Sequence, residues 1–255
     1  MPFQKIEPEK LAHAVERQIE HLILQGILRP GERLPSEREL SERLGVSRPS
    51  LREAIAALQD TGLLSTRAGA GVFVADVLGS AFSPALVRLF SRNEQAVFDY
   101  LAFRADLEGV AAARAARLGS DADLEVINSI FHRMAAAHEK RNPSLEAELD
   151  VEFHMAIIEA SHNVIMLHMM RSMFELLREG VFFNRSVMFR NRSTRDALLE
   201  QHRAINDAVQ ARDPEAARAA IARHMEFVDV ALHEQQKSER NEALARLRLL
   251  HEAGR

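Results

Sequence analysis

The chain has 255 residues, of which 47% are hydrophobic and 27% charged, and its formal net charge is −4. This length accommodates two domains, and the hydrophobic content is sufficient for packed cores. The acidic balance excludes a protein that binds nucleic acid through a uniformly basic surface. With no cysteine, no signal-peptide pattern and no apolar run long enough to span a membrane, we expect a cytoplasmic protein without a membrane partner.

Residues 36–62 predict two short helices joined by a tight turn. Ser36 stands three residues before Glu39, which is the spacing of a capping box, and Gly45 is suited to end the first helix. Ser47 is a good N-cap for the second helix. Apolar residues recur at helical spacing in that second helix at Leu51, Ala54, Ile55 and Leu58.

A two-stranded wing is predicted next, from residues 63–66 and 72–74, which flank Gly69 and Gly71. Arg48 and Arg52 lie off the apolar face of the second helix, near its N-terminal end, where a recognition helix reads bases in the major groove. Arginine can bind a guanine edge through two hydrogen bonds. The order of elements favours a reader of duplex DNA, although any helical protein could contain such a helix pair with solvated arginines.

The residue strings decide between these alternatives. Residues 30–40 (PGERLPSEREL) and 45–55 (GVSRPSLREAI) resemble the N-terminal domain of the GntR family of bacterial transcription regulators, and the resemblance covers about residues 8–75. It implies a winged helix-turn-helix that binds operator DNA as a dimer. The predicted DNA-binding residues are Arg38, Ser47, Arg48, Ser50, Arg52 and Gly71.

The composition changes after residue 76. We expect a DNA-binding domain at 1–76, a linker at 77–93, a helical domain for metal, effector and dimer contacts at 94–236, and a charged tail at 237–255. Breaks near residues 119, 142, 162, 192 and 213 divide the helical part into about six helices, whose short loops predict antiparallel neighbours. The predicted fold class is mainly α, with an N-terminal winged helix-turn-helix and a C-terminal all-α antiparallel bundle.

The helical part contains a candidate metal site. Asp150 and His154 are four residues apart and share a helix face, while His202 and His224 lie on later helices with apolar neighbours at helical spacing. Three imidazoles and one carboxylate suit a borderline divalent metal.

Spacing alone does not establish this site, because the chain has eleven histidines and pairs of an acid and a histidine at helical spacing arise by chance. Asp229 with His233 is another such pair, and Glu159 with His162 also resembles a pair of ligands. A single buried histidine more often donates a hydrogen bond in a core than binds a metal.

A second resemblance favours the metal site. Residues 101–109 (LAFRADLEG), 149–157 (LDVEFHMAI), 160–163 (ASHN), 201–205 (QHRAI) and 223–225 (RHM) look like the FCD ligand-binding domain of the FadR subfamily. The resemblance implies that Asp150, His154, His202 and His224 bind one divalent ion. It also implies that Arg104 helps to hold a carboxylate effector, whereas an ion pair with Glu108 is the alternative role of Arg104.

Within the subfamily, the strings most resemble regulators of pyruvate, glycolate and lactate metabolism. The chain is therefore interpreted as a dimeric transcription regulator, a repressor by the commoner mode of the family, that binds an inverted repeat and a small organic acid. The expected cofactor is zinc, with nickel or manganese as alternatives. Two rival hypotheses are a metalloenzyme, with Glu152 or Glu159 as a base, and a pure metal sensor; we expect no enzyme.

Overall fold

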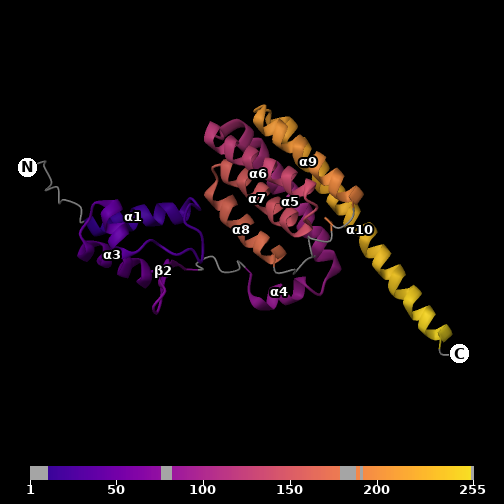
Figure 1. The fold of residues 1–255 in the computed structure, drawn as a ribbon, viewed down its shortest axis with the longest axis horizontal. Helices are drawn as coiled ribbons and strands as arrows, with labels where there is room; N and C mark the ends of the chain where they lie inside the picture. The colour runs from indigo at the N-terminus through magenta and orange to yellow at the C-terminus, as the bar shows by residue number, and fades with distance from the viewer. Residues whose placement is uncertain (1–10, 76–81, 179–187, 190–191, 254–255) are drawn as a thin grey trace, which may run out of the picture. The chain divides into compact units, whose positions relative to one another are not determined.

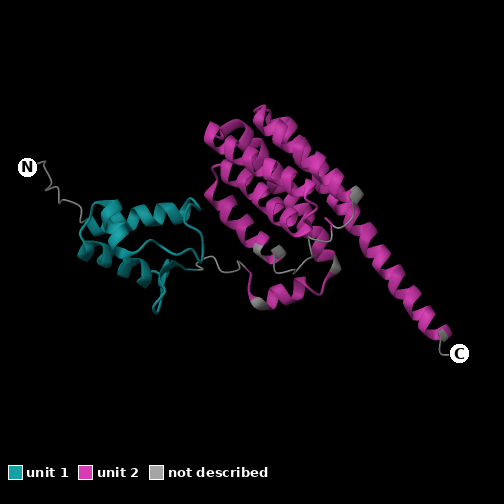
Figure 2. Ribbon diagram, in the orientation of Figure 1, with its two compact units in different colours: residues 1–81 teal, residues 82–255 magenta. Residues whose placement is uncertain are grey.

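The structure is a computed structural model that describes residues 11–75, 82–178, 188–189 and 192–253 (Figure 1). It divides into two compact units, residues 1–81 and 82–255 (Figure 2). The described residues are mainly helical and contain one sheet of two antiparallel strands. These findings confirm the predicted fold class. No helix in the described ranges is long and apolar enough to cross a membrane.

Unit 1 contains three helices and the wing. The helices pack around one small core, in which Leu51 and Ala54 of the third helix are completely buried beside Val15 and Ile19 of the first. The core thus holds the exposed face of the third helix in place. The elements of unit 1 are α1 (Leu11–Leu24), α2 (Glu37–Leu44), α3 (Arg48–Asp60), β1 (Leu64–Arg67) and β2 (Gly71–Val74).

Local capping explains where α2 and α3 begin and end. Ser36 Oγ accepts a hydrogen bond from the backbone N–H of Glu39 at 3.3 Å, and Gly45 ends α2 with φ 65°. Ser47 Oγ accepts from the N–H of Ser50 at 3.3 Å. Such caps stabilise a helix by about 1 kcal/mol each. The predicted helix-turn-helix is confirmed.

The wing is an antiparallel pair of strands whose second strand begins at Gly71. Leu64 pairs with Val74 and Arg67 with Gly71, so the first strand begins one residue later than predicted. Gly71 has φ 106°, and a Cβ atom there would lie 3.1 Å from Nε of Arg33. A side chain at this position would therefore be strained by the backbone and crowded by its neighbour.

Unit 2 contains a short helix followed by six longer ones, which matches the predicted number after residue 94 in the described part of the chain. The short helix, Pro84–Phe90, falls in the segment expected to be a linker, whose residues 77–81 lie outside the described residues. The helices are α4 (Pro84–Phe90), α5 (Glu94–Leu118), α6 (Asp121–Glu139), α7 (Pro143–Ala160), α8 (Val164–Arg178), α9 (Arg192–Gln210) and α10 (Pro214–Ala253).

The bundle is organised around α5, which contacts α7, α9 and α10. Its C-terminal third carries small side chains that are completely buried, which lets the neighbouring helices approach closely. They are Ala111, Ala112, Ala115 and Ala116. Polar residues on α5, α7, α9 and α10 can therefore meet in the interior.

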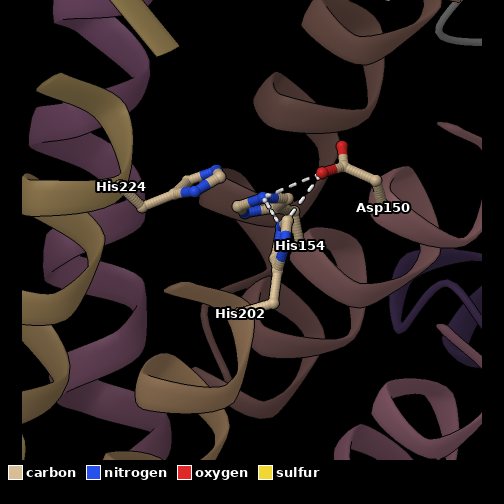
Figure 3. Close-up of side chains that lie close together, drawn as sticks. All are labelled: Asp150, His154, His202 and His224. Atoms are coloured by element: carbon tan, nitrogen blue, oxygen red, sulfur yellow. Dashed lines mark hydrogen bonds and ion pairs between the residues drawn. The ribbon is translucent and has the colours of Figure 1, made fainter. Parts of the chain in front are cut away.

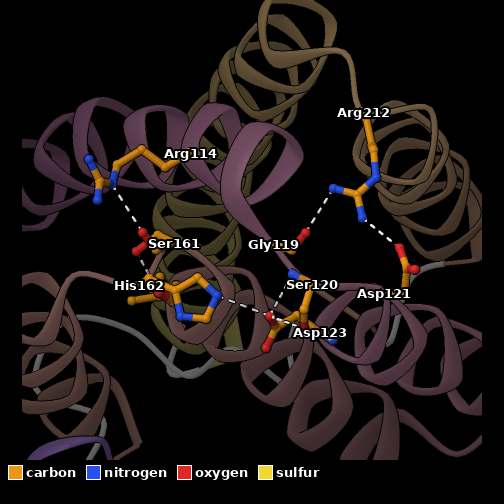
Figure 4. A network of polar contacts seen from close by, with 9 residues as sticks. Arg114, Gly119, Ser120, Asp121, Asp123, Ser161, His162 and Arg212 are labelled. Carbon is orange, nitrogen blue, oxygen red and sulfur yellow. Dashed lines mark hydrogen bonds and ion pairs between the residues drawn. The ribbon is translucent and has the colours of Figure 1, made fainter.

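Polar contacts join the turns between consecutive helices at one end of the bundle (Figure 4). Arg212, with φ 54°, donates to Gly119 O and to Asp121 Oδ1, both at 2.7 Å. His162, with φ 50°, places Nε2 3.0 Å from Oδ2 of Asp123. A left-handed backbone is costly for side chains other than glycine, and these contacts hold both residues in it.

The last helix continues through the segment expected to be a charged tail. Residues 237–252 of α10 are exposed, including Leu244, Leu247 and Leu250 at 47%, 63% and 70%. This segment is therefore helical up to residue 253, and residues 254–255 lie outside the described part.

Candidate metal centre

The four predicted ligand residues converge inside unit 2 (Figure 3). Asp150 and His154 project from adjacent turns of α7, His202 from α9 and His224 from α10. None is more than 2% exposed. Each offers one ligand atom, and these atoms all lie within 4.8 Å of one another.

The three histidines present the same nitrogen to this centre. Each Nδ1 faces an oxygen of the surrounding protein, in a hydrogen bond for His202 and His224 and in an ion-pair contact without hydrogen-bond geometry for His154. Because carboxylate and carbonyl oxygens only accept, these contacts favour a proton on Nδ1. Nε2 then carries a lone pair, as a metal ligand requires. The Nδ1 contacts are His154 to Glu108 Oε2 at 2.5 Å, His202 to Leu198 O at 2.7 Å and His224 to Gln201 Oε1 at 3.1 Å.

The inward atoms are all acceptors. His202 Nε2 lies 3.4 Å from His154 Nε2 and 3.0 Å from Asp150 Oδ1, and His154 Nε2 lies 3.9 Å from the same oxygen. His224 Nε2 is buried and has no hydrogen-bond partner within the described part of the chain. Lone pairs gathered in this way repel one another unless a cation lies among them.

The ligand atoms of Asp150, His154 and His202 are spaced for a zinc-sized ion, whereas the full set of four, with His224, lies within 4.8 Å. Ligand atoms about 2.0–2.1 Å from a tetrahedral zinc lie about 3.3 Å apart, and the separations of 3.0, 3.4 and 3.9 Å bracket that value. Imidazole with carboxylate also suits nickel and manganese. The arrangement can therefore bind a divalent metal, and its geometry does not select one of these ions.

Electrostatics favour the neutral form of two ligand imidazoles, those of His224 and His154. Burial lowers the pKa of His224 well below its ordinary value, and the nearby His202 and His154 lower it further. The pKa of His154 is also lowered, chiefly by burial, although Glu108 and Asp150 oppose the shift. Neutral imidazole is the form that binds a metal.

Arg104 on α5 lies beside this centre and is completely buried. Its Nε donates to Glu108 Oε1 at 2.6 Å, so the ion pair predicted as its alternative role exists. The guanidinium also lies over the ring of Phe174, 4.8 Å from the centroid. Its Nη2 nevertheless has no hydrogen-bond partner among the residues that the structure describes, which leaves a donor for an anionic ligand.

The charges around Arg104 and Glu108 reinforce each other. Burial disfavours both charged forms, but Arg104 and His154 outweigh it and hold the pKa of Glu108 at about 2. For Arg104, burial is likewise outweighed by Glu108, Tyr100 and Asp150, so its pKa lies above the ordinary value. Both groups are charged at neutral pH.

A small cavity adjoins the centre on the side of His202. Inside it Arg195 donates to both carboxylate oxygens of Glu146, with Nη2 2.7 Å from Oε1. This second buried ion pair has no role in the predicted sites. The lining residues are Met134, His138, Glu146, Phe189, Arg195, Leu199 and His202.

The rival ligand pairs lie elsewhere. His162 is bound to Asp123, and His233 stacks on Phe98 with 3.7 Å between ring centroids. Neither histidine belongs to the ligand cluster found in the described residues.

The candidate bases of an enzyme are engaged in ion pairs. Glu152 pairs with Arg133 at 2.8 Å, and Glu159 with Arg171 at 3.2 Å. Both belong to polar contacts away from the four ligand atoms.

The predicted DNA-binding residues gather on α2, α3 and the wing of unit 1. Arg38, Arg48 and Arg52 are exposed, as base or phosphate contacts require. Arg52 Nε donates to Glu37 Oε2 at 2.8 Å, which ties the start of α2 to the second turn of α3. The two Oγ atoms of Ser47 and Ser50 lie 2.9 Å apart.

Sequence reasoning missed the outer partners of the ligands. The sequence predicts Glu108 only as a partner of Arg104, and it assigns no role to Leu198 or Gln201. Gln201 and Leu198 precede His202 by one and four residues on α9, and helical spacing could have indicated the Leu198 carbonyl. The contact between Glu108 and His154 depends on the packing of α5 against α7 and has no signal in the sequence.

Comparisons with known proteins agree with this architecture. Residues 11–74 match the family model "Bacterial regulatory proteins, gntR family", and residues 99–227 match the FCD domain. The solved structure of Streptococcus agalactiae GntR superimposes with a TM-score of 0.51 at 26% identity, covering 86% of this chain and 98% of that one.

Similar proteins extend over nearly the whole chain. The Glc operon transcriptional activator of Escherichia coli (strain K12) is 36% identical over 233 residues, 90% of this chain and 92% of that protein. An Escherichia coli (strain K12) protein named for regulation of the L-lactate dehydrogenase operon is 34% identical over 88% of this chain and 87% of its own length. The chain belongs to the GntR family of bacterial transcription regulators, and its C-terminal unit carries an FCD domain of the FadR type.

Proposed function

We propose that this regulator binds an inverted-repeat operator as a homodimer and responds to a small organic acid held beside a divalent metal. The observation that carries the proposal is the convergence of three imidazole lone pairs and the Asp150 carboxylate next to Arg104. A metal ion accounts for the first feature, and an acid accounts for the Arg104 Nη2 without a hydrogen-bond partner.

The metal would be held by Asp150, His154, His202 and His224. Zinc is the expected ion, with nickel or manganese as alternatives. When bound, it would supply positive charge, and an ion that takes more than four ligands would also offer coordination positions to oxygen ligands. The surrounding protein would orient the three imidazoles through the contacts of their Nδ1 atoms.

The effector would be a small carboxylate such as lactate, glycolate or pyruvate. Arginine binds a carboxylate through charge-assisted hydrogen bonds, and Arg104 is held in place by Glu108 and Phe174. Two relatives are named for the Glc operon and for the L-lactate dehydrogenase operon, which agrees with an acid of this size. Full burial of Arg104 leaves no room for a large ligand without rearrangement.

Unit 1 would read the operator through α3 and the wing. Arg48 and Arg52 are the proposed base contacts, with Arg38, Ser47, Ser50 and Gly71 at neighbouring contacts. Two copies of the chain would match the two halves of an inverted repeat. We propose repression as the response, although the relative that is 36% identical is named an activator.

Metal analysis of the purified protein tests the centre. The expected result is about one divalent ion per chain, and none in the double variant His202→Ala/His224→Ala. A matched double variant, His13→Ala/His251→Ala, removes two exposed histidines and should keep the ion. Equal metal content in both double variants would contradict the site. A pure metal sensor would release its DNA on metal removal alone, with no effect of any acid.

A further inference from the structure

Glu108 lies between the two halves of the proposed site. Its Oε1 accepts from Arg104 Nε at 2.6 Å, and its Oε2 lies 2.5 Å from His154 Nδ1. The side chain of Glu108 is 1% exposed, so these two contacts replace its hydration. One carboxylate thus joins the proposed effector residue on α5 to a proposed metal ligand on α7.

We propose that Glu108 is a positioning residue that couples metal binding to acid binding. This inference rests on the proposed function, because it requires a metal at the four-residue centre and an acid at Arg104. It adds a connection between the metal site and the acid site through the Glu108 side chain, which does not require the acid to contact the metal.

The metal side of this connection follows from ordinary histidine chemistry. A carboxylate that accepts from the outer nitrogen of a ligating histidine fixes its tautomer and its ring orientation, and loss of such a partner lowers metal affinity about 10–100-fold. His154 is placed for this arrangement, since its Nε2 lies at the centre and its Nδ1 lies in ion-pair contact with Glu108 Oε2, although without hydrogen-bond geometry in this structure.

The acid side follows from the geometry of the guanidinium. Glu108 engages Nε, Phe174 lies against the face of the group, and Nη2 remains for a ligand. An acid bound at Nη2 therefore fixes the position of Arg104 and, through Nε, that of Glu108. Because the other oxygen of Glu108 contacts His154, a fixed Glu108 restricts the His154 ring and strengthens its binding to the metal.

Linkage makes the proposal measurable. If a metal raises the affinity for an acid by some factor, the acid raises the affinity for the metal by the same factor. This coupling factor is the ratio of acid affinities in metal-saturated and metal-free protein. Acid oxygens that bind the metal directly would also contribute to the coupling factor. The contribution of Glu108 is therefore the decrease in the coupling factor when Glu108 is substituted.

Glu108→Gln and Glu108→Asp separate geometry from charge. Glutamine keeps the length of the side chain but loses its charge. Its amide NH2 group would also face either Arg104 Nε or His154 Nδ1, which are both donors. Aspartate keeps the charge but is one methylene too short to reach both. If Glu108 merely neutralises buried Arg104, Glu108→Asp should behave like the parent. Glu146→Gln is the matched control, since Glu146 is also buried and paired with an arginine, Arg195.

The experiment is calorimetric titration of zinc, and of lactate with and without saturating zinc, into the full-length parent and these variants. We expect both Glu108 variants to lose about 10–100-fold in zinc affinity. We also expect their coupling factor to fall about fivefold or more, within the range of ordinary allosteric couplings. Glu146→Gln should keep both parental values. If Glu108→Gln fails to fold, Glu108→Asp provides the same two measurements.

The outcomes distinguish this inference from the function on which it rests. A parent protein that binds neither zinc nor any small acid contradicts the proposed function. A parent that binds both, with Glu108 variants that keep its zinc affinity and its coupling factor, overturns only the role of Glu108.

Discussion

Arg48 and Arg52 are the residues on which sequence-specific binding should depend most. Both are exposed on α3 near its start, and a bidentate arginine–guanine contact contributes roughly 1–3 kcal/mol of discrimination. We predict that Arg48→Ala and Arg52→Ala each weaken operator binding by this amount in a shift assay at fixed salt. Arg246→Ala, which removes an exposed charge from α10, is the control. If both α3 variants bind like the parent, the assignment of α3 as the recognition helix is wrong.

The burial of His224 makes the free energy of unfolding depend on pH. Burial and the neighbouring imidazoles lower its pKa in the folded state, so the folded protein rejects a proton that the unfolded chain takes up below about pH 6.5. The contribution to stability is present above that pH and is lost as the pH falls toward the folded pKa. We predict that metal-free protein melts at lower temperature at about pH 5.5 than at about pH 7.5. His224→Gln should flatten this dependence, and an unchanged slope in that variant would contradict the prediction.

At the scale of the elements, the ligands connect α7, α9 and α10. A metal bound only by the folded state stabilises it by about 4 kcal/mol at a thousandfold excess over its dissociation constant. We predict that a chelator lowers the unfolding temperature of the parent but not that of His202→Ala/His224→Ala. Scanning calorimetry measures both. If the chelator leaves the unfolding temperature of the parent unchanged, no metal bridges these helices.

Local chemistry determined which elements were predictable. Ser36, Ser47 and Asn142 cap helices through neighbours in sequence, so the helix starts could be placed from sequence. Ser83 acts in the same way, since its Oγ accepts from Leu86 N at 3.3 Å and Pro84 follows in the first turn. The start of α4 was overlooked because a serine followed by a proline also occurs in linkers.

The candidate site was predictable only in part. The spacing of Asp150 and His154 indicated one helix face, but nothing in the spacing of His202 and His224 showed that α9 and α10 reach the same point. Resemblance to the family supplied that step. The second contact of Glu108, with a residue 46 positions later, arises from tertiary packing and could not be derived from the sequence.

For the whole molecule we predict a homodimer. One winged helix covers only half of an inverted repeat, so two copies are required to read the whole site. Light scattering at micromolar concentration should give about twice the mass of 28.7 kDa. The control is the same measurement on operator DNA, where two chains per duplex are expected. A monomer in both conditions would contradict the dimeric model.

Titration of an acid with and without the metal tests the central proposal most directly. Calorimetry would measure lactate, glycolate and pyruvate binding to metal-loaded and metal-stripped parent protein, and to Arg104→Lys, which keeps the charge but loses the planar fork. We predict that at least one acid binds the loaded parent about tenfold or more tightly than the stripped parent. Arg104→Lys should keep its metal and bind that acid more weakly. Equal affinity of every acid for loaded and stripped protein would contradict the account, because the metal and the acid would then be independent.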